Sequence, residues 1–184
     1  PFLFCIVIPL LAMNSWSDEK KSHTDRLLAA YPIDNFLLAA AKYAALLVCF
    51  TVAATAVLII PLSVIPLVYF DFFSFFLSYC AMLLFGAAFT AWALALSNAS
   101  IHTPVNFLLG FFTGIFFTVS HVLAQLIPLP ACAAGILRYC SFTLHFEAAA
   151  RGIFDTRDFF FYAALIAAAQ GISVLLLYLK EEQR

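Results

Sequence analysis

Residues 73–96 read FSFFLSYCAMLLFGAAFTAWALAL, a run in which no side chain carries a charge. A helix that crosses about 30 Å of hydrocarbon needs about 20 consecutive apolar residues, and this run is long enough. The uncharged stretch extends in both directions, because residues 72–137 contain no Asp, Glu, Lys or Arg. The sequence therefore predicts that this segment spans a membrane.

The composition of the whole chain points the same way. Of its 184 residues 65% are hydrophobic, 17% aromatic and 10% charged, and the mean hydropathy is +1.04. A soluble domain is typically about 45–50% apolar and about 25% charged, so the composition excludes an ordinary soluble globule and a disordered chain. The net charge of −1 leaves no basic surface for nucleic acid. We expect an integral membrane protein that contacts the lipid bilayer and no nucleic acid.

Four segments have the length and character of transmembrane helices. Proline pairs and the polar 97–104 stretch separate them, as expected of turns. The four predicted spans are 38–60, 73–96, 105–127 and 159–179. Residues 1–13 are apolar but too short to span, so we interpret them as a truncated transmembrane helix with residues missing upstream. The predicted fold class is an all-α polytopic membrane helix bundle, a single domain over residues 1–184.

The basic residues predict the orientation, because loops rich in Lys and Arg stay in the cytoplasm. The loops fall into two groups that alternate along the chain. One group, with the C-terminal tail, holds six basic residues: Lys20, Lys21, Arg26, Lys42, Lys180 and Arg184. The other group holds three: Arg138, Arg151 and Arg157. We therefore expect residues 14–37 and the C-terminus inside, and residues 61–72 and 128–158 outside.

The first polar segment, residues 13–32, reads MNSWSDEKKSHTDRLLAAYP. Ser22 or Thr24 is expected to cap a short helix there. Pro32 is expected to end that helix, because the residue before a proline is disfavoured in the α conformation. Three apolar side chains share one face of the helix: Leu27, Leu28 and Tyr31. The alternative is a solvated loop that only connects two spans, and the pattern leaves both open.

The second polar segment, residues 138–158, reads RYCSFTLHFEAAARGIFDTRD. Glu147 and Arg151 stand four residues apart, the spacing of an ion pair on a helix. Gly152 is typical of the residue after a helix. Asp155 or Thr156 can cap the last span. With the apolar residues before it, the segment predicts short helices that re-enter the outer leaflet.

Motifs for catalysis and nucleotide binding are missing from the sequence. It contains no phosphate-binding loop, no GxSxG and no HExxH, so no catalytic, metal or cofactor site is expected. Cys132 and Cys140 share the outer segment and either pair there or remain free. The GxxxG of Gly110 and Gly114 predicts close helix packing within the bundle.

Two sets of residues, in order, resemble one family. The first is Pro9-Leu10-Leu11-Ala12-Met13, Glu19-Lys20-Lys21, Thr24, Leu27-Leu28, Pro32 and Lys42-Tyr43. The second is His145-Phe146, Arg151-Gly152, Asp155, Arg157-Asp158 and Tyr162. The first set resembles the type-2 ABC transporter permeases, and the second resembles the C-terminal signature of their gliding-motility-type branch. The resemblance covers about residues 8–180; His23 and Ala41 stand where the family usually has Gly.

The resemblance implies a six-helix permease subunit, here without its first helix, in the bacterial cytoplasmic (inner) membrane. The resemblance implies that such a subunit pairs with a second permease and docks a separate ABC ATP-binding subunit. The implied coupling interface comprises Glu19, Lys20, Lys21, Thr24, Asp25, Leu27, Leu28 and Pro32. The implied outer re-entrant segment comprises His145, Phe146, Glu147, Arg151, Gly152, Asp155 and Asp158. The resemblance favours an exporter and does not specify its substrate.

Two other functions remain open at the level of sequence. One is a membrane scaffold that anchors a cytoplasmic partner without transport. The other is an intramembrane enzyme that uses His121, His145 or Glu147. The sequence disfavours the enzyme, because no pairing of a nucleophile with a base can be assembled from it. It does not separate a transporter from a scaffold.

Overall fold

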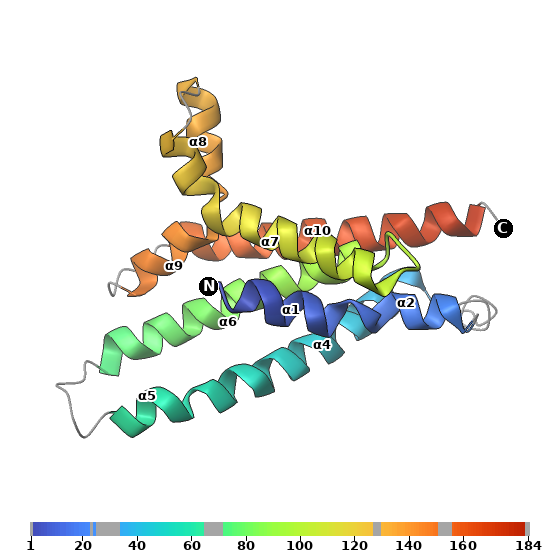
Figure 1. Ribbon diagram of the computed structural model, residues 1–184, viewed down its shortest axis with the longest axis horizontal. Coiled ribbons are helices and arrows are strands. Elements are labelled where there is room, and N and C mark those ends of the chain that lie inside the picture. The colour runs from blue at the N-terminus through green and yellow to red at the C-terminus, as the bar shows by residue number, and fades with distance from the viewer. Residues whose placement is uncertain are drawn as a thin grey trace.

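The computed structural model describes residues 2–22, 24, 34–64, 72–126, 130–150 and 156–182. The elements formed by these residues are all helices (Figure 1). Their bounds are α1 Phe4–Ala12, α2 Asn14–Lys21, α4 Asn35–Val57, α5 Ile59–Val64, α6 Phe72–Ser97, α7 Thr103–Leu126, α8 Ala131–Tyr139, α9 Phe142–Ala150 and α10 Thr156–Glu182.

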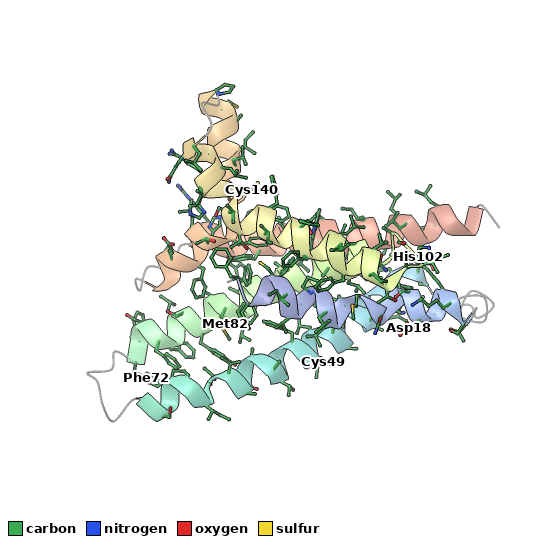
Figure 2. The ribbon with its side chains drawn as sticks, in the orientation of Figure 1. Asp18, Cys49, Phe72, Met82, His102 and Cys140 are labelled. Carbon is green, nitrogen blue, oxygen red and sulfur yellow. The ribbon has the colours of Figure 1, made fainter. Side chains whose placement is uncertain are left out.

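Four of these helices, α4, α6, α7 and α10, are long and apolar enough to cross a membrane. They correspond to the four predicted spans, and the all-α membrane helix bundle is confirmed. In Figure 1 α2, the turn between α6 and α7 and the C-terminal end of α10 lie at one end of the bundle. The start of α6, α5 and α9 lie toward the other end. Figure 2 places Asp18 and His102 at the first end and Phe72 at the second.

The N-terminal segment forms part of the bundle. Met13 keeps a helical backbone, with φ −58° and ψ −32°, so α2 continues almost directly from α1. The pair has one buried face, with residues three or four positions apart: Cys5, Ile8, Ala12 and Trp16. This face packs against α6 and α7. The opposite face of α1 exposes Ile6 and Leu10, as expected where a helix meets lipid.

One phenylalanine of α9 occupies the centre of the aromatic core. Phe142 is fully buried. Its ring centroid lies 5.1 Å from Phe85 of α6 and 5.1 Å from Phe117 of α7. Phe161 of α10 lies 6.2 Å away. Aromatic pairs of this kind each contribute about 0.5–1.5 kcal/mol beyond their buried area. Phe142 therefore packs α9 against three long helices at one point of the core.

Glycines allow the helices to approach closely, as the GxxxG motif predicts. A methyl group added at Gly110 would lie 2.9 Å from Cβ of Pro9 in α1. One added at Gly114 would collide with the ring of Phe89 in α6. Gly110 therefore allows close approach of α1, and Gly114 allows close approach of α6. Both contacts lie within this chain.

The first predicted span ends earlier than expected. Residues 38–60 were expected to form one helix, but α4 stops at Val57 and α5 follows as a separate helix. Leu58 N–H bonds Thr55 O at 3.1 Å, which tightens the last turn. Pro61 explains the break, because it has no N–H to continue the ladder. It falls in the first turn of α5, where that N–H needs no partner within the helix.

Candidate functional site

The first polar segment forms a helix earlier than the sequence predicts. Glu19, Lys20 and Lys21 lie in α2, which ends before Ser22. The Ser22 hydroxyl donates to Asp18 O at 2.7 Å, at the end of α2. The Ser22 N–H bonds the same oxygen at 3.0 Å, so Ser22 closes the last turn of α2. Residues 25–31 of the helix that Ser22 or Thr24 is predicted to cap lie outside the described residues, so that role stays a prediction. Four predicted coupling residues lie outside the described part of the chain: Asp25, Leu27, Leu28 and Pro32.

Thr24 also contacts the end of α2. Its hydroxyl donates to Glu19 O at 3.3 Å, and its oxygen lies 2.9 Å from the hydroxyl of Ser22. Thr24 was predicted as part of the coupling interface and as a possible cap of a following helix. In the structure its described contacts are those of a residue that closes α2.

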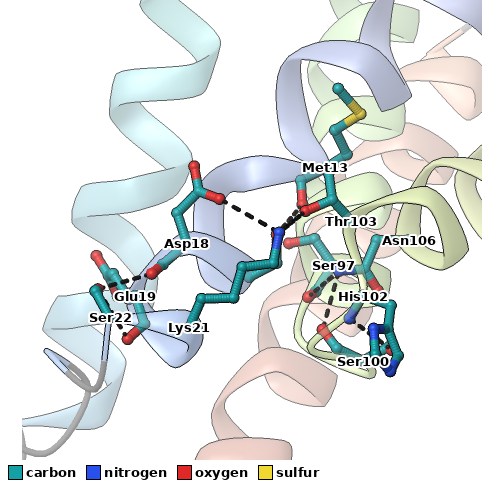
Figure 3. Close-up of polar contacts among 11 residues, drawn as sticks. Met13, Asp18, Glu19, Lys21, Ser22, Ser97, Ser100, His102, Thr103 and Asn106 are labelled. Atoms are coloured by element: carbon teal, nitrogen blue, oxygen red, sulfur yellow. Dashed lines mark hydrogen bonds and ion pairs between the residues drawn. The ribbon is translucent and has the colours of Figure 1, made fainter.

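Two lysines of α2 hold the turn between α6 and α7. Lys20 Nζ donates to Asn98 O at 2.6 Å. Lys21 Nζ donates to the Thr103 hydroxyl at 2.6 Å, and its closest carboxylate oxygen, of Asp18, is 3.9 Å away (Figure 3). The hydroxyl of Ser17 lies 3.1 Å from that of Thr103. Hydrogen bonds with a charged donor are stronger than neutral ones, so these contacts fix α2 against the turn.

The turn between α6 and α7 is itself braced from inside. Asn106, 3% exposed, donates to Ser97 O and to Ser100 O, each at 3.0 Å. His102 N–H donates to the Ser100 hydroxyl at 3.1 Å (Figure 3). The side-chain amide of Asn98 contacts Ser173 O of α10 at 3.5 Å. The lysines of α2 therefore bind a turn with a defined backbone.

Lys42 ties the first long helix to α2. It is the only charged residue of α4, and its side chain is 13% exposed. Its Nζ lies 2.6 Å from Glu19 Oε2 and donates to Ser15 O at 2.6 Å. The same nitrogen lies 3.9 Å from the ring centroid of Trp16. A lysine in an apolar helix needs such partners, because an unpaired charge there is costly.

We name these contacts of Glu19, Lys20, Lys21 and Lys42 the α2 clamp. Through it α2 is joined to α4 and to the ends of α6 and α7. The predicted interface contained the first three of these residues. It did not contain Lys42, nor Ser15 and Trp16, which Lys42 also contacts. A single lysine near the start of an apolar run was the available signal, because such a charge requires a partner. The sequence does not show which segment supplies that partner.

At the other end of the bundle, α9 meets the first turn of α10. His145 Nδ1 lies 2.6 Å from Asp158 Oδ1, and both side chains are 10% exposed. His145 Nε2 lies 2.8 Å from Tyr139 O. The imidazole stacks on Phe161, with 4.6 Å between ring centroids. Of the predicted outer residues, the structure thus brings His145 and Asp158 together.

Of the other predicted outer residues, the structure describes two. Phe146 is half-buried and Glu147 is exposed on α9. Arg151, Gly152 and Asp155 lie outside the described residues, so the predicted pair of Glu147 with Arg151 is not described. The α10 helix begins at Thr156, and its cap by Asp155 or Thr156 stays a prediction.

Hydrogen bonds also tie the turn between α8 and α9 to α7. His121 Nδ1 lies 3.1 Å from the hydroxyl of Ser141. Thr143 donates to Thr118 O at 2.8 Å. His121 and His145 thus have separate partners, and the described residues contain no group of three His, Cys, Asp or Glu placed to hold a metal. None of the five cysteines forms a disulfide in the part of the chain that the structure describes, so Cys132 and Cys140 are not paired.

Comparison of this chain with protein-family models, with curated proteins and with solved structures gives no match. A proposal for its function therefore depends on the contacts described above and on the sequence resemblance.

Proposed function

We propose that this chain is the membrane-spanning permease subunit of a bacterial ABC transporter, an exporter by resemblance. In this proposal it pairs with a second permease and moves substrate with ATP that a separate subunit hydrolyses. The observation that carries the proposal is the α2 clamp. It connects α2, a helix with several charged residues, to α4 and to the ends of α6 and α7.

A coupling contact has to transmit displacement, and a flexible loop would absorb it. The three lysines of the α2 clamp limit such flexibility, because each makes a short contact with another helix or turn. Lys20 and Lys21 bind the turn between α6 and α7, and Lys42 binds α2 from within α4. A force applied to α2 would therefore move the ends of three long helices together. A simple connecting loop has no need of this arrangement.

The same end of the bundle offers a surface for a partner. Asp18 keeps 62% of its side chain exposed at the outer face of α2. Ile101, in the braced turn, is 53% exposed. Stable interfaces combine an apolar centre with a polar rim. Ile101 and Asp18 supply one group of each kind on a rigid support.

The test is assembly with an ABC-class ATP-binding subunit encoded beside this chain. We expect the two chains to co-purify, and ATP hydrolysis to require both. Ile101→Asp should lower recovery of the ATP-binding subunit by about tenfold or more, because a charge would enter a desolvated contact. Thr156→Asp, at the other end of the bundle, is the matched control and should leave recovery unchanged.

Two outcomes contradict the proposal. One is ATP hydrolysis by this chain alone after contaminating ATPases are removed. The other is a stable complex that binds a cytoplasmic partner and shows no ATP-dependent transport of any substrate, which favours the scaffold.

A further inference from the structure

His145 and Asp158 form a contact whose geometry requires a proton. His145 Nε2 faces Tyr139 O at 2.8 Å, and a carbonyl oxygen can only accept, so Nε2 carries hydrogen. Nδ1 then faces Asp158 Oδ1 at 2.6 Å. A distance this short needs one hydrogen between the two atoms. Either the ring donates to a carboxylate, or a carboxylic acid donates to the ring.

Because the pair is buried, loss of this proton would be energetically unfavourable. Asp158 is 7% exposed, and its second oxygen, Oδ2, accepts no hydrogen bond from the described residues. If the proton left, the imidazole would keep a single hydrogen. A nitrogen lone pair would then face either the Asp158 carboxylate or Tyr139 O in a poorly solvated site, and one of the two contacts would be lost. Removing one charge of a buried pair leaves the other uncompensated, which is strongly unfavourable.

Among the described residues, the groups that pack against the pair are mainly aromatic rings. From α10 and α8, Tyr162 and Tyr139 face the imidazole, with ring centroids 6.0 Å and 5.6 Å away. The α6 and α7 helices contact α9 through aromatic rings that pack around Phe142. The imidazole of His121 in α7 contacts Ser141, not the pair. The other charged side chains of the described parts of α8, α9 and α10 near this end are Arg138, Glu147 and Arg157.

We propose that the pair of His145 and Asp158 is a proton-binding latch. With one proton bound, it holds α9 and the end of α8 on the first turn of α10. When the proton passes to water, the latch opens and this outer part of the chain separates from α10. Imidazole is the side chain whose charge ordinarily changes between about pH 5 and pH 8, so a change of pH can operate such a latch.

The contact joins three helices, so its loss would affect the position of all three. Tyr139 ends α8, His145 lies in α9, and Asp158 lies in the first turn of α10. Phe142 and Thr143 still tie the start of α9 to α7 and to the core. Opening should therefore loosen residues 144–150 and leave the spans assembled. The latch does not depend on the proposed ATP-binding partner.

The test is hydrogen–deuterium exchange of residues 142–150 in lipid nanodiscs, from about pH 6 to about pH 9, corrected for the intrinsic exchange rate. In the wild-type protein, protection should fall by about tenfold or more across this range, the loss expected from one charge-assisted hydrogen bond. Flat protection in the wild type would overturn the proposal.

Asp158→Asn is the decisive variant. An Asn amide can donate to the Nδ1 lone pair of a neutral imidazole, which closes the latch without a titrating proton. We expect this variant to stay protected at every pH, whereas Asp158→Ala should be unprotected throughout. His121→Gln removes the other histidine of this end and should keep the wild-type pH profile. Loss of the profile in His121→Gln, or an unprotected Asp158→Asn, would contradict the assignment.

Discussion

Lys42 of α4 and Glu19 of α2 form an ion pair, with 2.6 Å between Nζ and Oε2. The lysine comes from an apolar helix, and the glutamate comes from a polar helix outside it. Their side chains are 13% and 30% exposed, so the pair is only partly screened by solvent. This contact fixes the position of α2 on the bundle and underlies the predictions for its end of the molecule.

A double-mutant cycle should show that this pair is energetically coupled. Lys42→Met and Glu19→Gln should each lower the free energy of unfolding. The coupling energy should be about 1–3 kcal/mol, as for other contacting residues in partly buried sites. The exposed pair of Lys21 and Asp18, 3.9 Å apart, is the control and should couple by about 0–1 kcal/mol. Unfolding in mixed micelles measures both, and equal coupling in the two pairs would contradict the account.

Close packing at Gly86 should be intolerant of a methyl group. A Cβ added there would overlap the ring of Phe50 in α4, so Gly86→Ala should destabilise the bundle by about 1–3 kcal/mol. Gly171 of α10 has nothing within 4 Å of an added Cβ. Gly171→Ala should therefore be neutral or slightly stabilising, because alanine favours the helix. Thermal unfolding in the same detergent compares the two variants, and similar losses would show that packing is not the cause.

Asn106 should be essential for the conformation of the turn between α6 and α7, which the lysines of α2 contact. Asn106→Ala removes two hydrogen bonds to backbone carbonyls and should cost about 1–3 kcal/mol. Limited proteolysis should then cut within residues 97–102. Thr113→Ala, on the same helix, removes an exposed hydroxyl that donates to carbonyls of its own helix, and should change stability by less than about 0.5 kcal/mol. An unaltered proteolytic pattern in Asn106→Ala would argue against the bracing role.

The orientation can be tested with single cysteines in a background without the five native ones. We expect Thr156→Cys to react with a membrane-impermeant maleimide in intact cells. Ser22→Cys should react only after permeabilisation, because the loops near α2 carry the excess of basic residues. Both substituted residues are exposed in the structure. The reverse pattern would invert the orientation and remove α2 from the cytoplasm.

The spans could be predicted from the sequence because length and apolar character alone decide them. Contacts between residues that lie far apart in the sequence could not be predicted in this way. Lys42 lies in an apolar run, so its charge is expected to need a partner. Nothing in the sequence shows that Ser15 and Glu19 are its partners. His145 and Asp158 stand on either side of a segment whose path the sequence does not define. A serine can bond either end of a helix, and the sequence does not show that the Ser22 hydroxyl bonds Asp18 O.

The boundary between α4 and α5 shows a second limit. Pro61 was recognised as a break, but the predicted span ran up to it. The helix ends before Leu58, because a proline removes a hydrogen bond from the turn that precedes it. Sequence patterns locate such a break within a few residues, and the hydrogen bonds locate its end.

The most direct test of the central claim is photo-cross-linking from α2 in membranes that contain the ATP-binding subunit. With Asp18→p-benzoylphenylalanine, we predict a covalent adduct to that subunit, identified by mass spectrometry. Adding Lys42→Met should reduce its yield, because α2 loses its anchor on α4. The same probe at position 156 should give no such adduct. An adduct from position 156 and none from position 18 would contradict the proposal that α2 receives the ATP-binding subunit.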